Sequence, residues 1–375
     1  MREEIEKILD SYDLKNITIG VLGSHCALDV CRGAKDEGFP TLVVCQKGRE
    51  KAYSQYYKSS GSTGIVDEVI VLEKFKDILD DSIQKKLRDK NVIFIPNRSF
   101  EVYLDFDYEK IENKFSVPLF GNRFLLKAEE RNLKNNQYDL LKKSNIRMPK
   151  IFDNWKAIDQ ICLVKIPEKT RKFERSFFVC SSPAEFQKNI QEKINNNEID
   201  QEQVNQAIIE EFVIGSLVNF NYFYSPLSKQ VELLGTDMRK QTNLDGLLRL
   251  TASEQLLLKD KLKPKFEEAG HIAVTVLESL LEKVFDMAER FATITQKEYA
   301  PGIIGPFALQ SMITPGPPSK DIVVFDVSLR MPGSPGIMFT PYTYYKYGIS
   351  ISAGRRIAME IKQAIKENRL HEVVT

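Results

Sequence analysis

The chain has 375 residues, with 53 lysines and arginines against 52 aspartates and glutamates, and 42% of its residues are hydrophobic. This length suits two or three packed domains of roughly 100–200 residues each. Its near-neutral charge argues against a nucleic acid or an anionic membrane as partner, and no run approaches the roughly 20 apolar residues of a membrane span, so we expect small-molecule partners.

The cysteines are odd in number and lack C-x-x-C spacing, which argues against a disulfide framework and against a zinc site. We therefore expect reduced core cysteines in a cytoplasmic protein. The sequence leaves the oligomeric state open, and a homo-oligomer is compatible with it. The five cysteines are Cys26, Cys31, Cys45, Cys162 and Cys180.

Apolar β-branched runs alternate with helical stretches through the first hundred residues. Continuous apolar strands separated by amphipathic helices, at 27–35 and 77–90, predict an α/β fold whose parallel sheet is covered on both faces. In such sheets ligands bind beyond the carboxyl ends of the strands, which directs attention to the loops at 23–25 and 96–99. The predicted strands are 17–22, 42–45, 69–72 and 92–95.

The rest of the chain predicts a second α/β unit. Residues 117–150 form a connection, and 163–180 form a β-hairpin with a long basic turn at 168–175. The C-terminal helix that begins at Ser352 carries an isoleucine stripe typical of core packing. Further elements are a polar helix at 183–195, a strand at 206–213 and two later strands at 305–311 and 322–330.

An ATP-dependent carboxylate ligase needs a lysine on the phosphates, a hinge for adenine and ribose, and oxygen ligands for a divalent cation. Lys165, the segment 210–213, and Gln310 with Asp326 occur in the required order. Simpler interpretations remain open. A lysine at a strand end is more often a solvated charge, and a lone histidine such as His25 is more often structural. An ionised Asp326 between Phe325 and Val327 does require a partner or a metal ion.

A series of motifs spans the chain nearly end to end. It includes Leu22-Gly23-Ser24-His25, Arg32-Gly33-Ala34-Lys35, Lys47-Gly48-Arg49, Val117-Pro118-Leu119-Phe120-Gly121-Asn122-Arg123, Tyr222-Phe223-Tyr224-Ser225-Pro226-Leu227, Gly305-Pro306-Phe307 and Gly354-Arg355-Arg356-Ile357-Ala358. In this order, the series resembles one known family, the archaeal 5-formaminoimidazole-4-carboxamide ribonucleotide (FAICAR) synthetases. The whole series is far more specific than any single motif above.

The resemblance implies an N-terminal parallel-sheet pre-ATP-grasp domain over residues 1–123 and an ATP-grasp domain over 124–375, with a small lid subdomain at about 150–212. It implies an ATP-dependent carbon–nitrogen ligase of purine (IMP) biosynthesis. ATP would activate formate as formyl phosphate, and the 5-amino group of 5-aminoimidazole-4-carboxamide ribonucleotide (AICAR) would attack it. The expected metal ion is Mg²⁺ or Mn²⁺.

The resemblance also implies roles for individual residues, although it assigns no catalytic residue. AICAR would contact His25, Ser99 and His271, and the metal ion would bind Gln310 and Asp326. The residues implied for ATP binding are Lys165, Arg175, Glu210, Glu211, Phe212, Val213 and Gln241.

This chain departs from the family pattern near those same sites. The turn 168–175 has no glycine where the family has a glycine-rich loop, whose backbone amides can approach phosphate closely. Gln241 and Asp326 each replace a glutamate, His271 replaces an asparagine, and 331–336 replaces an acidic segment. Two alternatives therefore stay open: a related ligase that uses another small carboxylate, and a nucleotide-binding protein without turnover.

Overall fold

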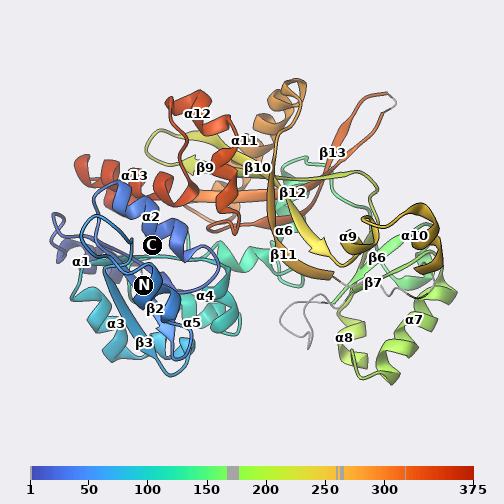
Figure 1. Cartoon of the computed structure of the whole chain (residues 1–375), viewed down its shortest axis with the longest axis horizontal. Coiled ribbons are helices and arrows are strands. Elements are labelled where there is room, and N and C mark those ends of the chain that lie inside the picture. Colours follow the sequence, from blue (N-terminus) through green and yellow to red (C-terminus); the bar gives the residue numbers. More distant parts are fainter. Residues whose placement is uncertain (1, 167–176, 259–260, 262–265, 317) are drawn as a thin grey trace.

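A computed structural model describes residues 2–166, 177–258, 261, 266–316 and 318–375. The described residues form three sheets, of four, five and four strands, in an α/β architecture. Figure 1 shows the N-terminal sheet at one end of the molecule, the five-stranded sheet in the middle and the small sheet at the other end.

The N-terminal sheet is parallel, as the sequence predicts. Its strand order is β3-β2-β1-β4. Both faces are covered, because Val21 belongs to one buried core and its neighbour Leu22 to another. The predicted helix at 77–90 is divided, since Asp80 has extended backbone (φ −68°, ψ 134°) between a 3-10 turn and α3. The elements are β1 (Thr18–Leu22), β2 (Thr41–Gln46), β3 (Glu68–Leu72), β4 (Val92–Ile95), α1 (Arg2–Asp10), α2 (Ala27–Asp36), α3 (Asp81–Arg88), α4 (Arg98–Tyr103) and α5 (Tyr108–Asn113).

The five-stranded sheet is antiparallel, with strand order β11-β10-β9-β12-β13. One face packs on α11 through Phe307, whose ring centroid lies 6.0 Å from that of Phe291 and 5.0 Å from that of Tyr222. The opposite face carries polar side chains. The elements of this unit are β9 (Ser216–Ser225), β10 (Gln230–Thr242), β11 (Phe266–Val274), β12 (Gly305–Thr314), β13 (Asp321–Ser328), α6 (Gln137–Lys143), α9 (Leu244–Leu247), α10 (Ala252–Leu258), α11 (Leu281–Glu298) and α12 (Tyr342–Tyr347).

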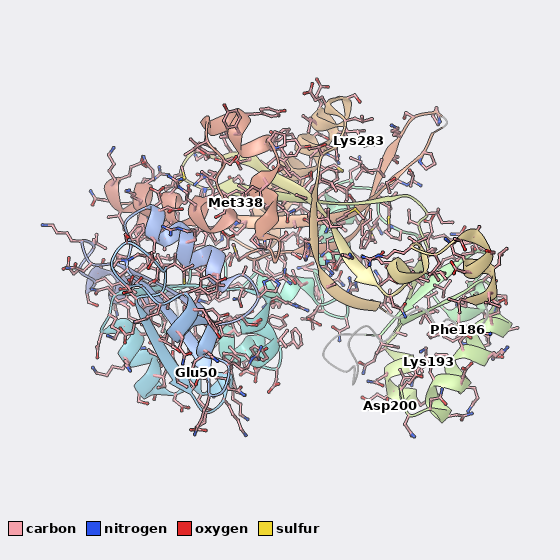
Figure 2. The ribbon with its side chains drawn as sticks, viewed as in Figure 1. Glu50, Phe186, Lys193, Asp200, Lys283 and Met338 are labelled. Atoms are coloured by element: carbon pink, nitrogen blue, oxygen red, sulfur yellow. The ribbon has the colours of Figure 1, made fainter. Side chains whose placement is uncertain are left out.

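The small sheet has strand order β5-β8-β6-β7 and antiparallel pairing. Its core forms where Phe186 stacks on Trp155, with ring centroids 5.9 Å apart. Figure 2 shows Phe186 at the small-sheet end of the molecule. The β6–β7 pairing confirms the predicted hairpin, whereas its basic turn at 168–175 lies outside the described residues. The elements are β5 (Ile151–Phe152), β6 (Cys162–Lys165), β7 (Phe177–Cys180), β8 (Ile208–Glu211), α7 (Pro183–Asn195) and α8 (Gln201–Asn205).

The C-terminal helix α13 (Ala353–Lys366) returns to the N-terminal unit and lies beside α2 (Figure 1). The two helices approach so closely that a Cβ at Gly33 would lie 2.1 Å from the backbone nitrogen of Arg355. The isoleucine stripe predicted for α13 lies in the core, where Ile357 and Ile361 are buried. This packing ties the two ends of the sequence together.

Two further expectations concern the cysteines and membranes. All five cysteines are buried and have free thiols, as predicted for core residues. Across the described ranges, no helix is both long enough and apolar enough to cross a membrane.

Candidate functional site

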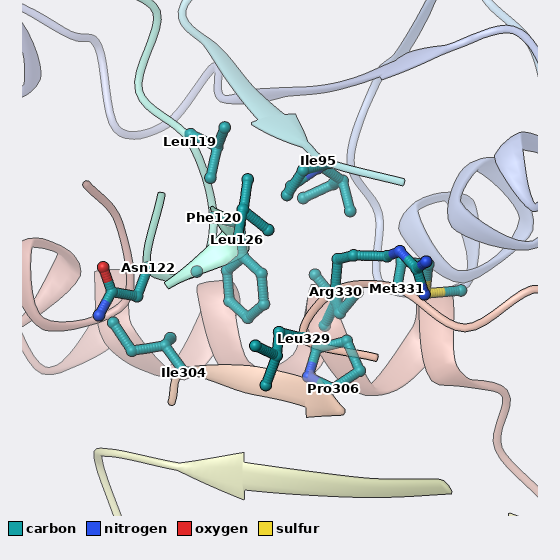
Figure 3. A pocket seen from close by; sticks show the side chains of 13 residues that line it. Ile95, Leu119, Phe120, Asn122, Leu126, Ile304, Pro306, Leu329, Arg330 and Met331 are labelled. Atoms are coloured by element: carbon teal, nitrogen blue, oxygen red, sulfur yellow. The ribbon is translucent and has the colours of Figure 1, made fainter. Parts of the chain in front are cut away.

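A cavity of about 850 Å³ lies where the three sheets approach one another. This volume is within the range of ligand-binding pockets. Its wall combines the loops after β1 and β4, the polar face of the five-stranded sheet and one face of the small sheet. A second cavity, where Ile95 and Phe120 meet Pro306 and Leu329, measures only about 10 Å³ (Figure 3). That volume holds at most about one water, so this second cavity is a packing junction between the sheets.

The loops after β1 and β4 meet at one edge of the N-terminal sheet, as expected from their strand ends. Asn97 joins them, because its Nδ2 donates to the carbonyl oxygens of Leu22 (3.2 Å) and Ser24 (3.3 Å). His25 lines the cavity in a left-handed backbone conformation, with φ of 55°. Ser99 is buried in the first turn of α4 and is not among the residues that line the cavity, so its contact with a substrate stays a prediction.

Gly333 packs directly on His25. A Cβ at Gly333 would lie 2.4 Å from His25 Nε2. A larger residue at this position would therefore require the imidazole to move. Gly333 and His25 both line the cavity, so this contact shapes its wall.

Four charged side chains form a ring, of which Arg98, Glu129 and Arg330 line the same cavity as His25. Glu129 binds Arg98 (3.2 Å) and Arg330 (3.1 Å), and Glu101 binds the same two arginines (3.5 and 3.3 Å). Glu129 Oε1 also accepts the Leu329 amide at 2.6 Å. Each carboxylate is thus shared between an arginine of the N-terminal unit and one that follows β13.

The small-sheet end of the cavity is largely apolar. Apolar walls of this kind suit an aromatic base. Glu210, Glu211, Phe212 and Val213 all line this end, as does Lys165, but Arg175 lies outside the described residues. Gln241 belongs to β10, and its side chain lies outside the described part of the structure. The apolar lining consists of Leu163, Ile166, Val179, Ile208, Leu217, Met312 and Phe325.

A charge network crosses from this end to the five-stranded sheet. Lys165 Nζ forms an ion pair with Glu210, which accepts a hydrogen bond from Tyr138 Oη at 2.7 Å. Arg131 donates to Tyr138 (3.0 Å) and to Asp326 (2.5 Å). Burial lowers the pKa of Lys165 below its ordinary value, although Glu210 opposes this. Burial raises the pKa of Asp326, but Arg131 and Lys165 outweigh that effect and hold it below its usual range.

Gln310 and Asp326 stand directly opposite each other in the register of β12 and β13, and both line the cavity. Gln310 Nε2 donates to Ser328 at 3.4 Å, which leaves the amide oxygen for another partner. An amide oxygen and a carboxylate are ligands that suit a divalent cation bound together with phosphate groups. Among the described residues no cluster of three or more His, Cys, Asp or Glu side chains could hold a metal ion, so any such ion would rely on this smaller set.

His271 also lines the cavity, and its Nδ1 lies 2.6 Å from Asp237 Oδ2. Asp237 is 1% exposed and accepts hydrogen bonds from Asn219 (3.0 Å) and Asn221 (2.7 Å). Asp237, Asn219, Gln310 and Asp326 form one row across four adjacent strands, because each is the register partner of the next. The Oδ1 atom of Asn219 is buried with no hydrogen-bond partner among the described residues.

Sequence reasoning missed much of this wall, including Arg131, Tyr138, Asp237, Arg330 and the two asparagines of β9. One signal was available for the asparagines. Asn219 and Asn221 alternate with Val218, Phe220 and Tyr222 before Phe223 interrupts the pattern, and amides on one face of an otherwise apolar segment indicate a polar site. Arg131 carries no comparable local signal.

Comparison with known proteins identifies the family. A domain of unknown function (DUF1297) matches residues 185–375, and a protein of unknown function (DUF1246) matches residues 19–152. The 5-formaminoimidazole-4-carboxamide-1-(beta)-D-ribofuranosyl 5'-monophosphate synthetase of Methanopyrus kandleri is 41% identical over 375 residues, covering 100% of this chain and 99% of the relative. The synthetase of the same name from Methanobrevibacter smithii is 40% identical and covers 100% and 98%. The chain belongs to this synthetase family.

Solved structures agree with that assignment. The IMP biosynthesis protein PurP from Thermococcus kodakaraensis superposes with a TM-score of 0.71 at 28% identity, covering 95% of this chain and 100% of that protein. Phosphoribosylglycinamide synthetase from Anaerococcus prevotii has a TM-score of 0.56 at 15% identity, covers 95% of this chain and 76% of that protein, and supports the fold alone. The chain is an ATP-dependent ligase with an ATP-grasp fold, a class that uses ATP and a divalent metal ion.

Proposed function

We propose that this chain catalyses the ATP- and formate-dependent formylation of AICAR to FAICAR in IMP biosynthesis. The γ-phosphoryl group of ATP would activate formate as formyl phosphate, and the 5-amino group of AICAR would displace the phosphate. The printed name of relatives at 41% and 40% identity over the full length supports this choice of product.

The observation that carries the proposal is a single cavity of about 850 Å³ that is lined by members of both groups of implied residues. Its apolar end, with Lys165 and the segment 210–213, suits ATP. Its other end, with His25, suits the ribonucleotide. Two nucleotides that react through a shared intermediate need adjoining sites, because positioning is a large part of catalysis by such enzymes.

A metal ion, Mg²⁺ or Mn²⁺, would be held by Gln310 and Asp326 beside the ATP phosphates. Their side-chain oxygens are the hard donors that such ions prefer. The ion would neutralise phosphate charge during transfer. Lys165 would approach the same phosphates from β6, and Arg131 would compensate Asp326 when no ion is bound.

We also propose the domain division at residues 1–123 and 124–375, with the small sheet at about 150–212 as the lid. The small sheet meets the rest of the wall through polar and apolar side chains that line the cavity, which suits an element that closes over ATP. Cα positions with and without an ATP analogue, measured in two crystal structures, would test this division.

The test of the function is phosphate release by the full-length chain with ATP and Mg²⁺. Release that requires both formate and AICAR, with FAICAR identified by mass spectrometry, is the expected result. Release that occurs with acetate but not with formate would favour the related ligase that uses another carboxylate. The absence of release under every pairing would contradict a ligase reaction on these substrates.

A further inference from the structure

Asn219 of β9 lines the cavity with a side chain whose amide oxygen is not paired by the described residues. The residue is 3% exposed, and its Oδ1 is buried without a hydrogen-bond partner in the part of the chain that the structure describes. A buried acceptor without a donor is costly, and such a group in a folded protein calls for an explanation. The position of Asn219 in the cavity wall indicates that the donor belongs to a bound ligand.

The neighbouring carboxylate fixes which way this amide points. Asn219 Nδ2 lies 3.0 Å from Asp237 Oδ2. Burial raises the pKa of Asp237, but hydrogen bonds, above all those from His271 and Asn221, outweigh burial and hold that pKa below its ordinary value. The carboxylate is therefore ionised at neutral pH and can only accept hydrogen bonds. The NH₂ group of Asn219 must face Asp237, so Oδ1 is turned away from it.

Gln310, the neighbour on the other side of Asn219, does not supply the donor. It is the register partner of Asn219 on β12, and its Nε2 donates to Ser328 of β13 at 3.4 Å. On the other flank, His271 of β11 binds the same Asp237 carboxylate as Asn219 does. In strand order, Asn219 thus lies between the implied metal ligand Gln310 and the implied AICAR contact His271.

The chemistry of the proposed reaction places an amine at this point. Formyl phosphate would form where the metal ion meets the ATP phosphates, and the 5-amino nitrogen of AICAR must come within reach of its carbonyl carbon. Asp326 is two strands from Asn219, which at about 4.8 Å per strand separates their backbones by about 10 Å. An ion held by Gln310 and Asp326 would therefore lie next to Asn219 rather than be bound by it.

We propose that Asn219 Oδ1 accepts a hydrogen bond from the 5-amino group of AICAR and orients that amine for attack. The inference rests on the proposed function. In the attack, the nitrogen lone pair forms the C–N bond, and the C–O bond to phosphate breaks with its electron pair on the phosphate. The amine loses one proton, which ends on the departing group as HPO₄²⁻.

Asn219 itself takes no proton in this step. Its neutral oxygen holds an N–H of the amine, which turns the nitrogen lone pair toward the formyl carbon. A ribonucleotide that lacks the amino group would leave the buried oxygen without a donor, and sites built around such a hydrogen bond reject ligands that cannot make it. Asn219 is thus a positioning residue that also determines specificity for the amine.

The experiment compares two ligands on the full-length chain and on the variant N219A. AICAR and imidazole-4-carboxamide ribonucleotide, which lacks only the 5-amino group, are titrated by calorimetry. We expect N219A to bind AICAR about tenfold more weakly than the unaltered chain, because one hydrogen bond is lost, and to bind the analogue as the unaltered chain does. Single-turnover formation of FAICAR should fall by roughly 10²-fold even at saturating AICAR, since the amine is no longer aligned.

Two further variants separate this contact from the support of Asp237. N219S removes the amide oxygen but retains a donor for Asp237, so it should show the same ligand-dependent loss, and it replaces N219A if that variant does not fold. N221S removes the other amide donor to Asp237, at 2.7 Å, and any loss of affinity there should be equal for the two ligands. Mn²⁺ binding in the presence of ATP, followed by electron paramagnetic resonance, should be the same in N219A and in the unaltered chain.

Four results would overturn the role of Asn219. They are an unchanged affinity for AICAR in N219A and N219S, an equal loss for AICAR and for the analogue, the same ligand-dependent loss in N221S, and weaker Mn²⁺ binding, which would make Asn219 a metal ligand. Each leaves the proposed function standing when the unaltered chain forms FAICAR. An unaltered chain that binds AICAR but forms no FAICAR contradicts the proposed function instead, and the two-ligand comparison still tests the contact.

Discussion

The two ends of the cavity hold their charges in different ways. At the end that His25 lines, Arg98, Glu101, Glu129 and Arg330 form a closed ring whose side chains are 0–17% exposed, and among the described residues each carboxylate of the ring binds both arginines. At the small-sheet end, Lys165 has one carboxylate partner, Glu210, and Arg131 has one, Asp326.

This difference suggests that the ring stabilises the fold, whereas the charges at the small-sheet end bind ligands. A closed buried ring that joins two units is costly to open, because removing one member leaves desolvated charges behind. A cation held by one carboxylate can exchange that partner for a phosphate group, and a carboxylate can exchange its arginine for a metal ion, with little change in the number of charge-assisted contacts. We therefore expect changes at the ring to affect stability and changes at the small-sheet end to affect turnover.

The largest effect is expected for D326N. The amide retains a hydrogen-bond acceptor for Arg131, so the fold should persist, but the metal ion loses a negative ligand. Turnover should fall by roughly 10²–10³-fold, as it does when one preorganised charge-stabilising group is removed. The matched control is D321N, at the start of the same strand, where Asp321 binds Arg147 and Lys283 away from the cavity. Equal turnover in both variants would contradict the assignment of Asp326 as a metal ligand.

A second effect is expected for E129Q, within the closed ring. The change leaves Arg98 and Arg330 with one carboxylate between them, and breaking a buried ion pair in this way costs about 3–5 kcal/mol of unfolding free energy. Urea denaturation measures it. The control is E68Q, because Glu68 and Lys90 form a pair at 2.8 Å with side chains 39% and 36% exposed. Such surface pairs contribute about 0–1 kcal/mol, so a similar cost in both variants would contradict the comparison.

The smallest effect is expected for H25A, at the edge of the ring. The loss of one hydrogen-bonding side chain should weaken AICAR binding about tenfold, which is about 1.4 kcal/mol. ATP binding should stay unchanged, because the implied ATP residues lie at the other end. Calorimetry with each ligand tests this, with the exposed His371 replaced by alanine as control. An equal loss of affinity for AICAR and for ATP would contradict the proposal that the two ligands bind at separate ends of the cavity.

The N-terminal fold was predictable because its signals are local. Runs such as 42–45 and 92–95 are buried on both faces, and continuous apolar β-branched residues are the pattern that such burial requires. The sequence did not reveal β9, β10 and β11 as strands. On β9, Tyr222 and Phe223 are both buried, so the apolar run there has no clean alternation to indicate a sheet with one polar face.

For the site, sequence supplied residue types and tertiary structure supplied partners. Because Asp326 lies in an apolar strand, the sequence indicates that its carboxylate needs a partner. That partner, Arg131, is 195 residues away in the chain. No local periodicity relates positions so far apart. The glycine at 333 is a comparable case, because its close approach to the imidazole of His25 is visible only in the folded chain.

Sequence patterns alone predict the parallel N-terminal sheet, the β6–β7 hairpin, the core role of the C-terminal helix and, through motifs spread along the chain, the family. These depend on periodicity and on residue identity, which a linear sequence records. The row formed by Asp237, Asn219, Gln310 and Asp326, and the contact between Asp237 and His271, become visible only in the folded chain. Strand order and register fix which side chains become neighbours, and both arise from packing between distant segments.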